Sequence, residues 1–339
     1  MTQYSKFKVA AIQAAPVYFN PEASTAKACH LIESAGQKGV ELAAFGETWL
    51  PGYPFFVWGA GRGRAAWKAQ AAYLSAAVEI PSPVTEQLCA AARRASIDVV
   101  IGVAERDSLS RGTVYCTLLF ISREGSILGR HRKLRPTHKE RTAWGDGDAV
   151  GLSVYERPYG RISGLNCWEH NMVLPGYALM TQGTQIHVAA WPGTEAPAPP
   201  APIPMWERQL LLSRAFASQA AAYVIQAGGL LSEDQVPEEF KPWAYLATGD
   251  SCIIDPRGEV IAGPARGETI LTAEIDTEQI YAAKAAFDAA GHYARPDIFQ
   301  LHVNRSSHRP LVESSIGLKP AKTGVQQKLD PPGFAPSQE

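Results

Sequence analysis

Short apolar runs alternate along the chain with longer segments whose apolar residues recur at helical spacing. In the first third, the runs at 7–17, 40–47 and 97–105 predict buried strands. The segments at 20–39, 64–78 and 83–96 predict helices, the first with Asn20 as its cap and Gly39 at its end. This alternation favours layers of the α/β kind.

The pattern changes after residue 112, where paired apolar runs flank short turns. Residues 113–122 and 126–134, then 152–158 and 160–167, predict two hairpins. Alternation then resumes, with strands expected at 185–192 and 223–229, a helix at 204–222, a hairpin at 250–263, a strand at 269–276 and a helix at 276–290. Composition changes only near the end. We therefore predict one domain over 1–316 and a Pro/Gly-rich tail over 317–339 outside its core.

Composition narrows the functional classes. The 339 residues are 46% hydrophobic and carry a net charge of −1, which gives no basic field for nucleic acid or anionic lipid. The apolar run at the N-terminus is too short for a signal peptide, and no window is long enough for a membrane span, so we expect a cytoplasmic protein. Five scattered cysteines, none in a CxxC spacing, indicate reduced thiols.

One of these cysteines stands where a strand turns into a helix. Cys167 follows the apolar run "GRISGLN" and precedes a short helical segment that we expect Pro175 to interrupt. Unpaired N–H groups in a first helical turn favour a thiolate, as a nucleophile requires. A small buried hydrophobe is the alternative, because most free cysteines are that.

Charged residues at similar transitions supply the other groups that thiol chemistry requires. Glu47 ends an apolar strand and precedes the aromatic-rich "TWLPGYPFFVW", where burial would raise its pKa toward that of a proton shuttle. Lys133 follows a strand and is held by the turn residues after it, so its ammonium could stabilise negative charge. Glu140 is a further carboxylate nearby in the sequence, while Glu105 is ambiguous between a core-edge ion pair and a wall of the site.

Three motifs in order carry a family resemblance. "FGETWLPGYP", "HRKLRPTHKERTAWGDGD" and "GLNCWEH" resemble the Glu-Lys-Cys hydrolases of the carbon–nitrogen hydrolase superfamily, and more narrowly its nitrilase branch. The match runs from Phe7 to about Val303. It implies a four-layer αββα sandwich, an active site without metal or cofactor, and subunits that pair and often extend into helical assemblies.

The resemblance also implies roles for individual residues. Glu47 would be the general base, Lys133 the stabilising cation, Cys167 the nucleophile and Glu140 a second carboxylate near the lysine. The backbone N–H of Trp168 would complete the oxyanion site with Lys133. For substrate binding we expect Trp168, Tyr53 and His170.

The implied activity is hydrolysis of a small nitrile to its carboxylic acid and ammonia, and the aromatic residues after Glu47 favour arylaliphatic nitriles. The alternative within the superfamily is an amidase or carbamoylase. A papain-like hydrolase using His170 or His131 would leave Glu47 and Lys133 without a purpose. A non-catalytic relative would be expected to lack one of the three motif residues, and none is missing.

Overall fold

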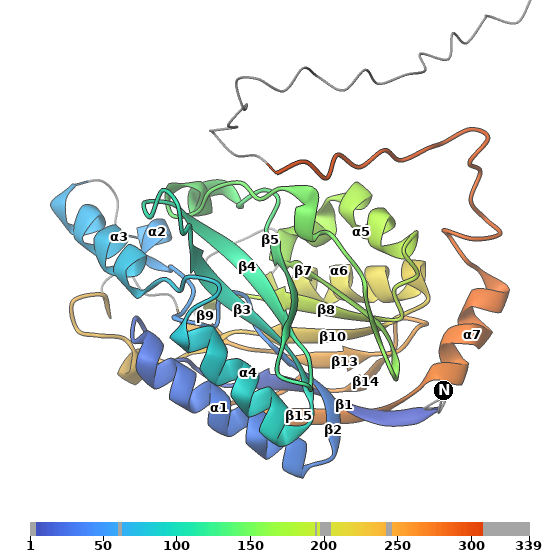
Figure 1. The fold of residues 1–339 in the computed structure, drawn as a ribbon, viewed down its shortest axis with the longest axis horizontal. Coiled ribbons are helices and arrows are strands. Elements are labelled where there is room, and N and C mark those ends of the chain that lie inside the picture. Colours follow the sequence, from blue (N-terminus) through green and yellow to red (C-terminus); the bar gives the residue numbers. More distant parts are fainter. Residues whose placement is uncertain (1–4, 60–62, 194, 197–204, 242–245, 308–339) are drawn as a thin grey trace, which may run out of the picture. The chain divides into compact units, whose positions relative to one another are not determined.

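Two six-stranded mixed sheets stand at the centre of the computed structural model (Figure 1). The structure describes residues 5–59, 63–193, 195–196, 205–241 and 246–307. The described residues up to Ser307 belong to one compact unit. The predicted tail over 317–339 lies outside the described residues, so the boundary at residue 316 stays a prediction.

The first sheet is built from both ends of the chain. The three strands from the N-terminal third of the chain run parallel to one another, as buried apolar strands joined by helices do. Antiparallel strands flank them on both sides. The order is β15 (Thr269–Asp276), β1 (Lys6–Gln13), β2 (Val40–Phe45), β3 (Asp98–Arg106), β4 (Val114–Ile121) and β5 (Ile127–Arg132).

The second sheet repeats this plan with residues from the middle of the chain. Strands β7, β8 and β10 run parallel, and the remaining neighbours are antiparallel. The order is β14 (Val260–Ala262), β13 (Cys252–Ile254), β10 (Tyr223–Gly228), β8 (Ile186–Trp191), β7 (Gly160–Asn166) and β6 (Tyr155–Arg157). The three predicted hairpins are thus present as β4/β5, β6/β7 and β13/β14.

The sheets face each other across an apolar core, to which both contribute alternate residues of their strands. Helices α1 (Pro21–Gln37) and α4 (Pro83–Ala95) pack on the outer face of the first sheet, and α5 (Val173–Met180) and α6 (Met205–Ala220) on that of the second (Figure 1). The predicted four-layer αββα sandwich is confirmed.

Local signals set several element ends where the sequence predicts them. The side chain of Asn20 accepts a hydrogen bond from the N–H of Ala23 at 3.0 Å, and Gly39 follows α1 with φ +72°. Further helices are α2 (Phe56–Gly59), α3 (Arg64–Ala76) and α7 (Thr277–Ala286), the last ending four residues before the predicted 290. None of the described helices has the length and apolar character needed to cross a membrane.

Two expectations fail for identifiable reasons. Pro175 does not interrupt a helix: a 3₁₀ turn covers Cys167–Asn171, and Pro175 then lies in the first turn of α5, where a missing N–H costs nothing. A small third sheet is formed by β9 (Glu195–Ala196), β11 (Leu230–Leu231) and β12 (Leu246–Thr248), in segments where the sequence pattern predicts no strand. Strands of two or three residues carry no readable period.

Candidate active site

The strand ends bring three of the predicted residues together. Glu47 follows β2, Lys133 directly follows β5, and Cys167 directly follows β7. The backbone N–H of Glu47 donates to the carbonyl of Trp191 at 3.1 Å, which ties the loop of the first sheet to β8 of the second. Gly102 on β3 permits this path, since a Cβ there would lie 2.2 Å from the carbonyl oxygen of Gly46.

Lys133 connects two buried carboxylates. Its Nζ donates to Glu47 Oε1 at 2.7 Å and to Glu140 Oε2 at 2.8 Å, and the three side chains are almost wholly excluded from solvent. Glu140 also accepts from the backbone N–H of Thr137 at 2.6 Å and from the hydroxyl of Tyr53 at 2.6 Å. Both carboxylate oxygens of Glu140 therefore accept hydrogen bonds, which holds the carboxylate in place beside the lysine.

Cys167 completes the group. The residue is 3% exposed, and its Sγ lies within 4.8 Å of one carboxylate oxygen each of Glu47 and Glu140. Glu47 Oε2 is buried without a hydrogen-bond partner within the described part of the chain. A buried, unpartnered carboxylate oxygen beside a thiol is suited to accept its proton.

Burial and the neighbouring charges together raise the pKa values of Glu47 and Lys133. Burial, reinforced by Glu140 and opposed by Lys133, raises the pKa of Glu47 to about 7. Burial alone would lower the pKa of Lys133, but Glu140 and Glu47 outweigh it and raise that pKa well above its usual value. The lysine therefore stays an ammonium, while Glu47 can gain and lose a proton near neutrality.

The thiol of Cys167 differs from the sequence expectation. Burial first, and then the charge of Glu47, raises its pKa well above the usual value, although Lys133 and the backbone N–H of Trp168 act in the opposite direction. The helix-terminus effect that we expected is thus present but outweighed. The raised pKa keeps Cys167 a thiol at neutral pH, so attack by its sulfur would require that the proton leave.

The sequence profile of the carbon–nitrogen hydrolase family matches residues 8–285. The chain belongs to the carbon–nitrogen hydrolase family. It is 53% identical over 320 residues to "Nitrilase 2" of an unknown prokaryotic organism, an alignment that covers 92% of this chain and 96% of that protein. "Aliphatic nitrilase" of Rhodococcus rhodochrous is 36% identical over 319 residues, covering 92% and 86%. The predicted nitrilase branch is confirmed.

A solved structure shares the fold at low sequence identity. The carbon–nitrogen hydrolase of Helicobacter pylori G27 superposes with a TM-score of 0.70 and 17% identity, covering 87% of this chain and 97% of the other. The expectation that the chain is a hydrolase of carbon–nitrogen bonds agrees with its family.

Glu169 is a part of this hydrolase's site that the sequence reasoning missed. Its buried carboxylate accepts from the N–H of Leu134 at 2.9 Å and of Asn166 at 2.8 Å, the residues adjoining Lys133 and Cys167. His131 Nε2 lies 3.0 Å from both oxygens. Glu169 thereby fixes the lysine segment against the cysteine turn. The spacing of Asn166 and Glu169, which is that of a capping box, was the available signal.

The residues predicted to bind substrate lie in different surroundings. The hydroxyl of Tyr53 contacts Glu140, and its ring lines a small cavity beside Glu47. The ring of Trp168 is half-buried under the guanidinium of Arg208, 5.1 Å from its centroid. His170 uses both ring nitrogens in hydrogen bonds to protein groups. The substrate-binding roles of these residues stay predictions.

Glu105, which the sequence left ambiguous, is held by cations of the first sheet. Its buried carboxylate contacts Arg132 at 2.5 Å and Arg130 at 2.8 Å, and Thr117 donates to it at 2.8 Å. The hydrolase thus uses Glu105 in an ion-pair network at the end of β3.

The donor atoms of Glu47, Glu140 and Cys167 are of types that bind metals and lie close enough to share an ion. The ammonium of Lys133 already donates to both carboxylates, however, and so occupies the place where a metal cation would be attracted. The two carboxylates therefore already have a cationic partner, and the arrangement does not require a metal ion.

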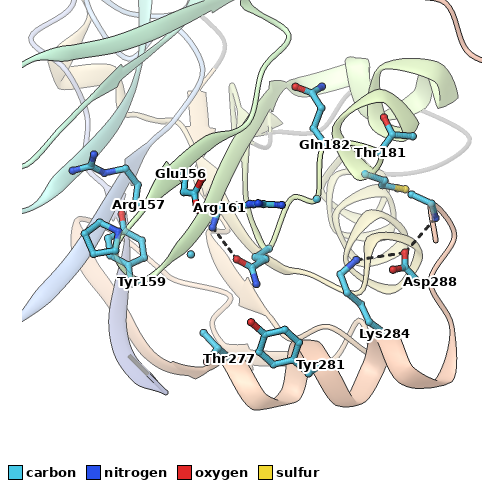
Figure 2. Close-up of a pocket in the computed structure, with 16 residues that line it drawn as sticks. Glu156, Arg157, Tyr159, Arg161, Thr181, Gln182, Thr277, Tyr281, Lys284 and Asp288 are labelled. Carbon is cyan, nitrogen blue, oxygen red and sulfur yellow. Dashed lines mark hydrogen bonds and ion pairs between the residues drawn. The ribbon is translucent and has the colours of Figure 1, made fainter. Parts of the chain in front are cut away.

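Among the cavities lined by described residues, two differ greatly in size. The cavity beside Glu47 has a volume of about 20 Å³, and its walls include Trp49, Tyr53, Phe55 and Leu231. A much larger one of about 1060 Å³ lies among β6, β7 and α7, with Arg161, Tyr281 and Lys284 on its walls (Figure 2). The larger cavity contains none of the predicted catalytic residues, so size does not identify the site here.

Proposed function

We propose that the protein is a nitrilase, which converts a nitrile and two waters to a carboxylic acid and ammonia. The observation that carries this proposal is the buried group in which Lys133 donates to Glu47 and the Cys167 Sγ lies within 4.8 Å of a Glu47 carboxylate oxygen. The names of the relatives, a nitrilase and an aliphatic nitrilase, support the choice of substrate class.

In the first step, the thiol proton of Cys167 passes to Glu47 while sulfur bonds to the nitrile carbon. Glu47 accepts it on Oε2, the oxygen without a hydrogen-bond partner among the described residues. Because the pKa of Glu47 is about 7, the protonated acid can then give the proton to the nitrile nitrogen as its π bond breaks. The product is a thioimidate on Cys167.

Water then replaces nitrogen. Glu47 removes a proton from water as its oxygen bonds to the thioimidate carbon, and the resulting tetrahedral carbon holds sulfur, oxygen and nitrogen. Lys133 and the N–H of Trp168 stabilise negative charge at this stage. Return of this proton to nitrogen gives a carbon that bears hydroxyl, amino and sulfur groups. Transfer of the hydroxyl proton to the amino nitrogen through Glu47 then breaks the C–N bond, which releases ammonia and leaves a thioester. A second water, activated in the same way, releases the acid and restores the thiol.

We further propose an arylaliphatic preference. Aromatic walls beside Glu47, including Tyr53 and Phe55, support it. The cavity volume of about 20 Å³ is close to what a single water needs, so an aryl group requires these walls to move apart on binding.

The experiment is a substrate panel with ammonia and acid measured together. Purified protein is given phenylacetonitrile, phenylacetamide and butyronitrile, with Cys167→Ala as the inactive control. We expect ammonia and phenylacetic acid from the arylaliphatic nitrile and little from the amide. Faster hydrolysis of the amide would establish the amidase alternative instead. Reaction with butyronitrile alone would leave the nitrilase proposal standing and overturn the aryl preference.

We also propose that the protein forms homo-oligomers. Helices α5 and α6 expose large apolar side chains, among them Val173 at 79%, Leu174 at 62% and Leu211 at 62%. Exposed apolar residues on neighbouring elements are typical of subunit interfaces. The net charge of −1 sets up little repulsion between copies.

A further inference from the structure

A chain of side-chain hydrogen bonds leads away from the nucleophile into the second sheet. His170 Nδ1 lies 2.7 Å from the carbonyl oxygen of Cys167, and His170 Nε2 lies 3.0 Å from His187 Nε2. His187 Nδ1 lies 2.8 Å from the hydroxyl of Ser163, which lies 2.6 Å from that of Thr184. All but His170 are buried, and His170 is half-buried.

The donor and the acceptor in each of these hydrogen bonds follow from the Cys167 carbonyl oxygen at the end of the chain of bonds. A carbonyl oxygen only accepts, so His170 carries its proton on Nδ1 and presents a lone pair on Nε2. His187 must then donate from Nε2 and accept on Nδ1 from the hydroxyl of Ser163. Burial lowers the pKa of His170 to about 4 and that of His187 well below its usual value, in agreement with two neutral rings.

Aromatic packing fixes the planes of both rings. His170 stacks on Trp191 with 5.3 Å between ring centroids, and His187 stacks on Phe216 with 3.8 Å. The carbonyl of Trp191 accepts the N–H of Glu47. Strand β8 therefore carries both the second histidine and the residue that holds the general base.

The group at the end of this chain is the backbone of Cys167, which has φ +48°. A residue with a Cβ atom rarely adopts this left-handed backbone conformation. The conformation persists where the surrounding structure stabilises it. We propose that the His170–His187 pair positions the nucleophile: it holds the carbonyl of Cys167, and with it the turn that directs the thiol toward Glu47. Both histidines are positioning residues and take no part in proton transfer.

This inference rests on the proposed function, and it differs from a substrate-binding role for His170. A ring that meets the substrate needs a free nitrogen or face directed into the site. Both nitrogens of His170 are used, one face is covered by Trp191, and the ring is not among the walls of the cavity beside Glu47.

Three variants separate positioning from general structural support. His170→Phe keeps the stacked ring and removes both hydrogen bonds. His170→Asn keeps an N–H that can reach the Cys167 carbonyl. Ser163→Ala removes the hydroxyl that orients His187, with little change in volume. His30→Phe, on the exposed side of α1, is the matched control.

Turnover of phenylacetonitrile and alkylation of Cys167 by iodoacetamide, followed by peptide mass, are the two measurements. We expect His170→Phe to lower kcat about 100-fold, with KM changed less than about threefold, because a misplaced nucleophile loses rate more than binding. His170→Asn should retain kcat within about tenfold of wild type. Alkylation of Cys167 should slow most in His170→Phe and less in His170→Asn. The control His30→Phe should match wild type in turnover and in alkylation.

Equal rates in His170→Phe and wild type would overturn the proposal, as would a loss in His170→Asn as large as in His170→Phe. If His170→Phe does not fold, Ser163→Ala decides: lower kcat at unchanged KM supports positioning, and unchanged kcat overturns it. If wild type hydrolyses no nitrile, the proposed function fails, yet the alkylation rates of the same variants still decide the role of the histidines.

Discussion

Lys133 donates to one oxygen of Glu47 at 2.7 Å, and the other oxygen of that carboxylate has no partner within the described part of the chain. The two oxygens thus have different surroundings. One is fixed by a permanent cation, and the other is free to exchange a proton. A single carboxylate can therefore be held in place and still serve as a base.

Removing either member of this pair should nearly abolish nitrile hydrolysis. Glu47→Gln removes the proton acceptor and should lower kcat by about 10²–10⁴-fold. Lys133→Ala removes the cation and leaves Glu47 and Glu140 facing each other, which favours protonation of the base. Initial rates of ammonia release test both, with the exposed Glu22→Gln as control. Near wild-type kcat in either variant would contradict the assigned roles.

The activity should depend on pH through Glu47. A base works when deprotonated, so with a pKa of about 7 we expect kcat/KM to rise through neutrality and then level off. The thiol of Cys116 donates to Glu47 Oε1 at 3.3 Å and lowers this pKa. Cys116→Ala should therefore move the midpoint to higher pH, and Cys116→Ser should move it less. A profile flat between pH 5 and 9 would count against Glu47 as the base.

The candidate site residues could be selected from the sequence, because each stands where an apolar strand ends. Glu47, Lys133 and Cys167 follow strands whose apolar runs are readable, and the ordered motifs carry a family pattern. Their contacts were not predictable from spacing. The sequence separation of 86 between Glu47 and Lys133 does not fix the distance between their side chains until the sheet order is known.

The state of the thiol was not predictable either, because it depends on a balance of effects. A strand-to-helix corner indicates the N–H groups near Cys167, but it does not indicate how completely the residue is buried. Likewise, Glu169 has an ordinary capping-box position in the sequence. Its contact with Leu134 arises only when β5 and β7, from different sheets, lie together.

Glu169→Gln should destabilise the fold by about 3 kcal/mol, as loss of a buried charged partner does. The amide NH₂ would face a backbone N–H of Leu134 or Asn166. Burial opposes ionisation of Glu169, but His131 and these N–H groups outweigh it and lower its pKa. The wild-type advantage is therefore full above the ordinary glutamate pKa and is lost as the pH falls through the lowered one. Urea unfolding at two pH values tests this, and equal stability of variant and wild type would contradict it.

Chelators should leave the activity unchanged. The carboxylates that could bind a metal both accept hydrogen bonds from Lys133, whose charge does not depend on any added ion. Rates of ammonia release before and after EDTA treatment and dialysis should agree. A loss that zinc restores would show that Glu47, Glu140 and Cys167 hold an ion in the working enzyme.

The exposed apolar residues of α5 and α6 should hold copies of the chain together. Burying them removes apolar surface from water, and a symmetric pair buries each residue twice. We expect light scattering at micromolar concentration to report a dimer or larger species for the wild type. Val173→Asp combined with Leu211→Asp should shift the assembly toward monomers, because each new carboxylate would be desolvated in the interface.

Leu109→Asp is the control, since Leu109 is 74% exposed on the turn between β3 and β4. Dissociation by the control alone would place the interface elsewhere, and a monomeric wild type would refute self-association.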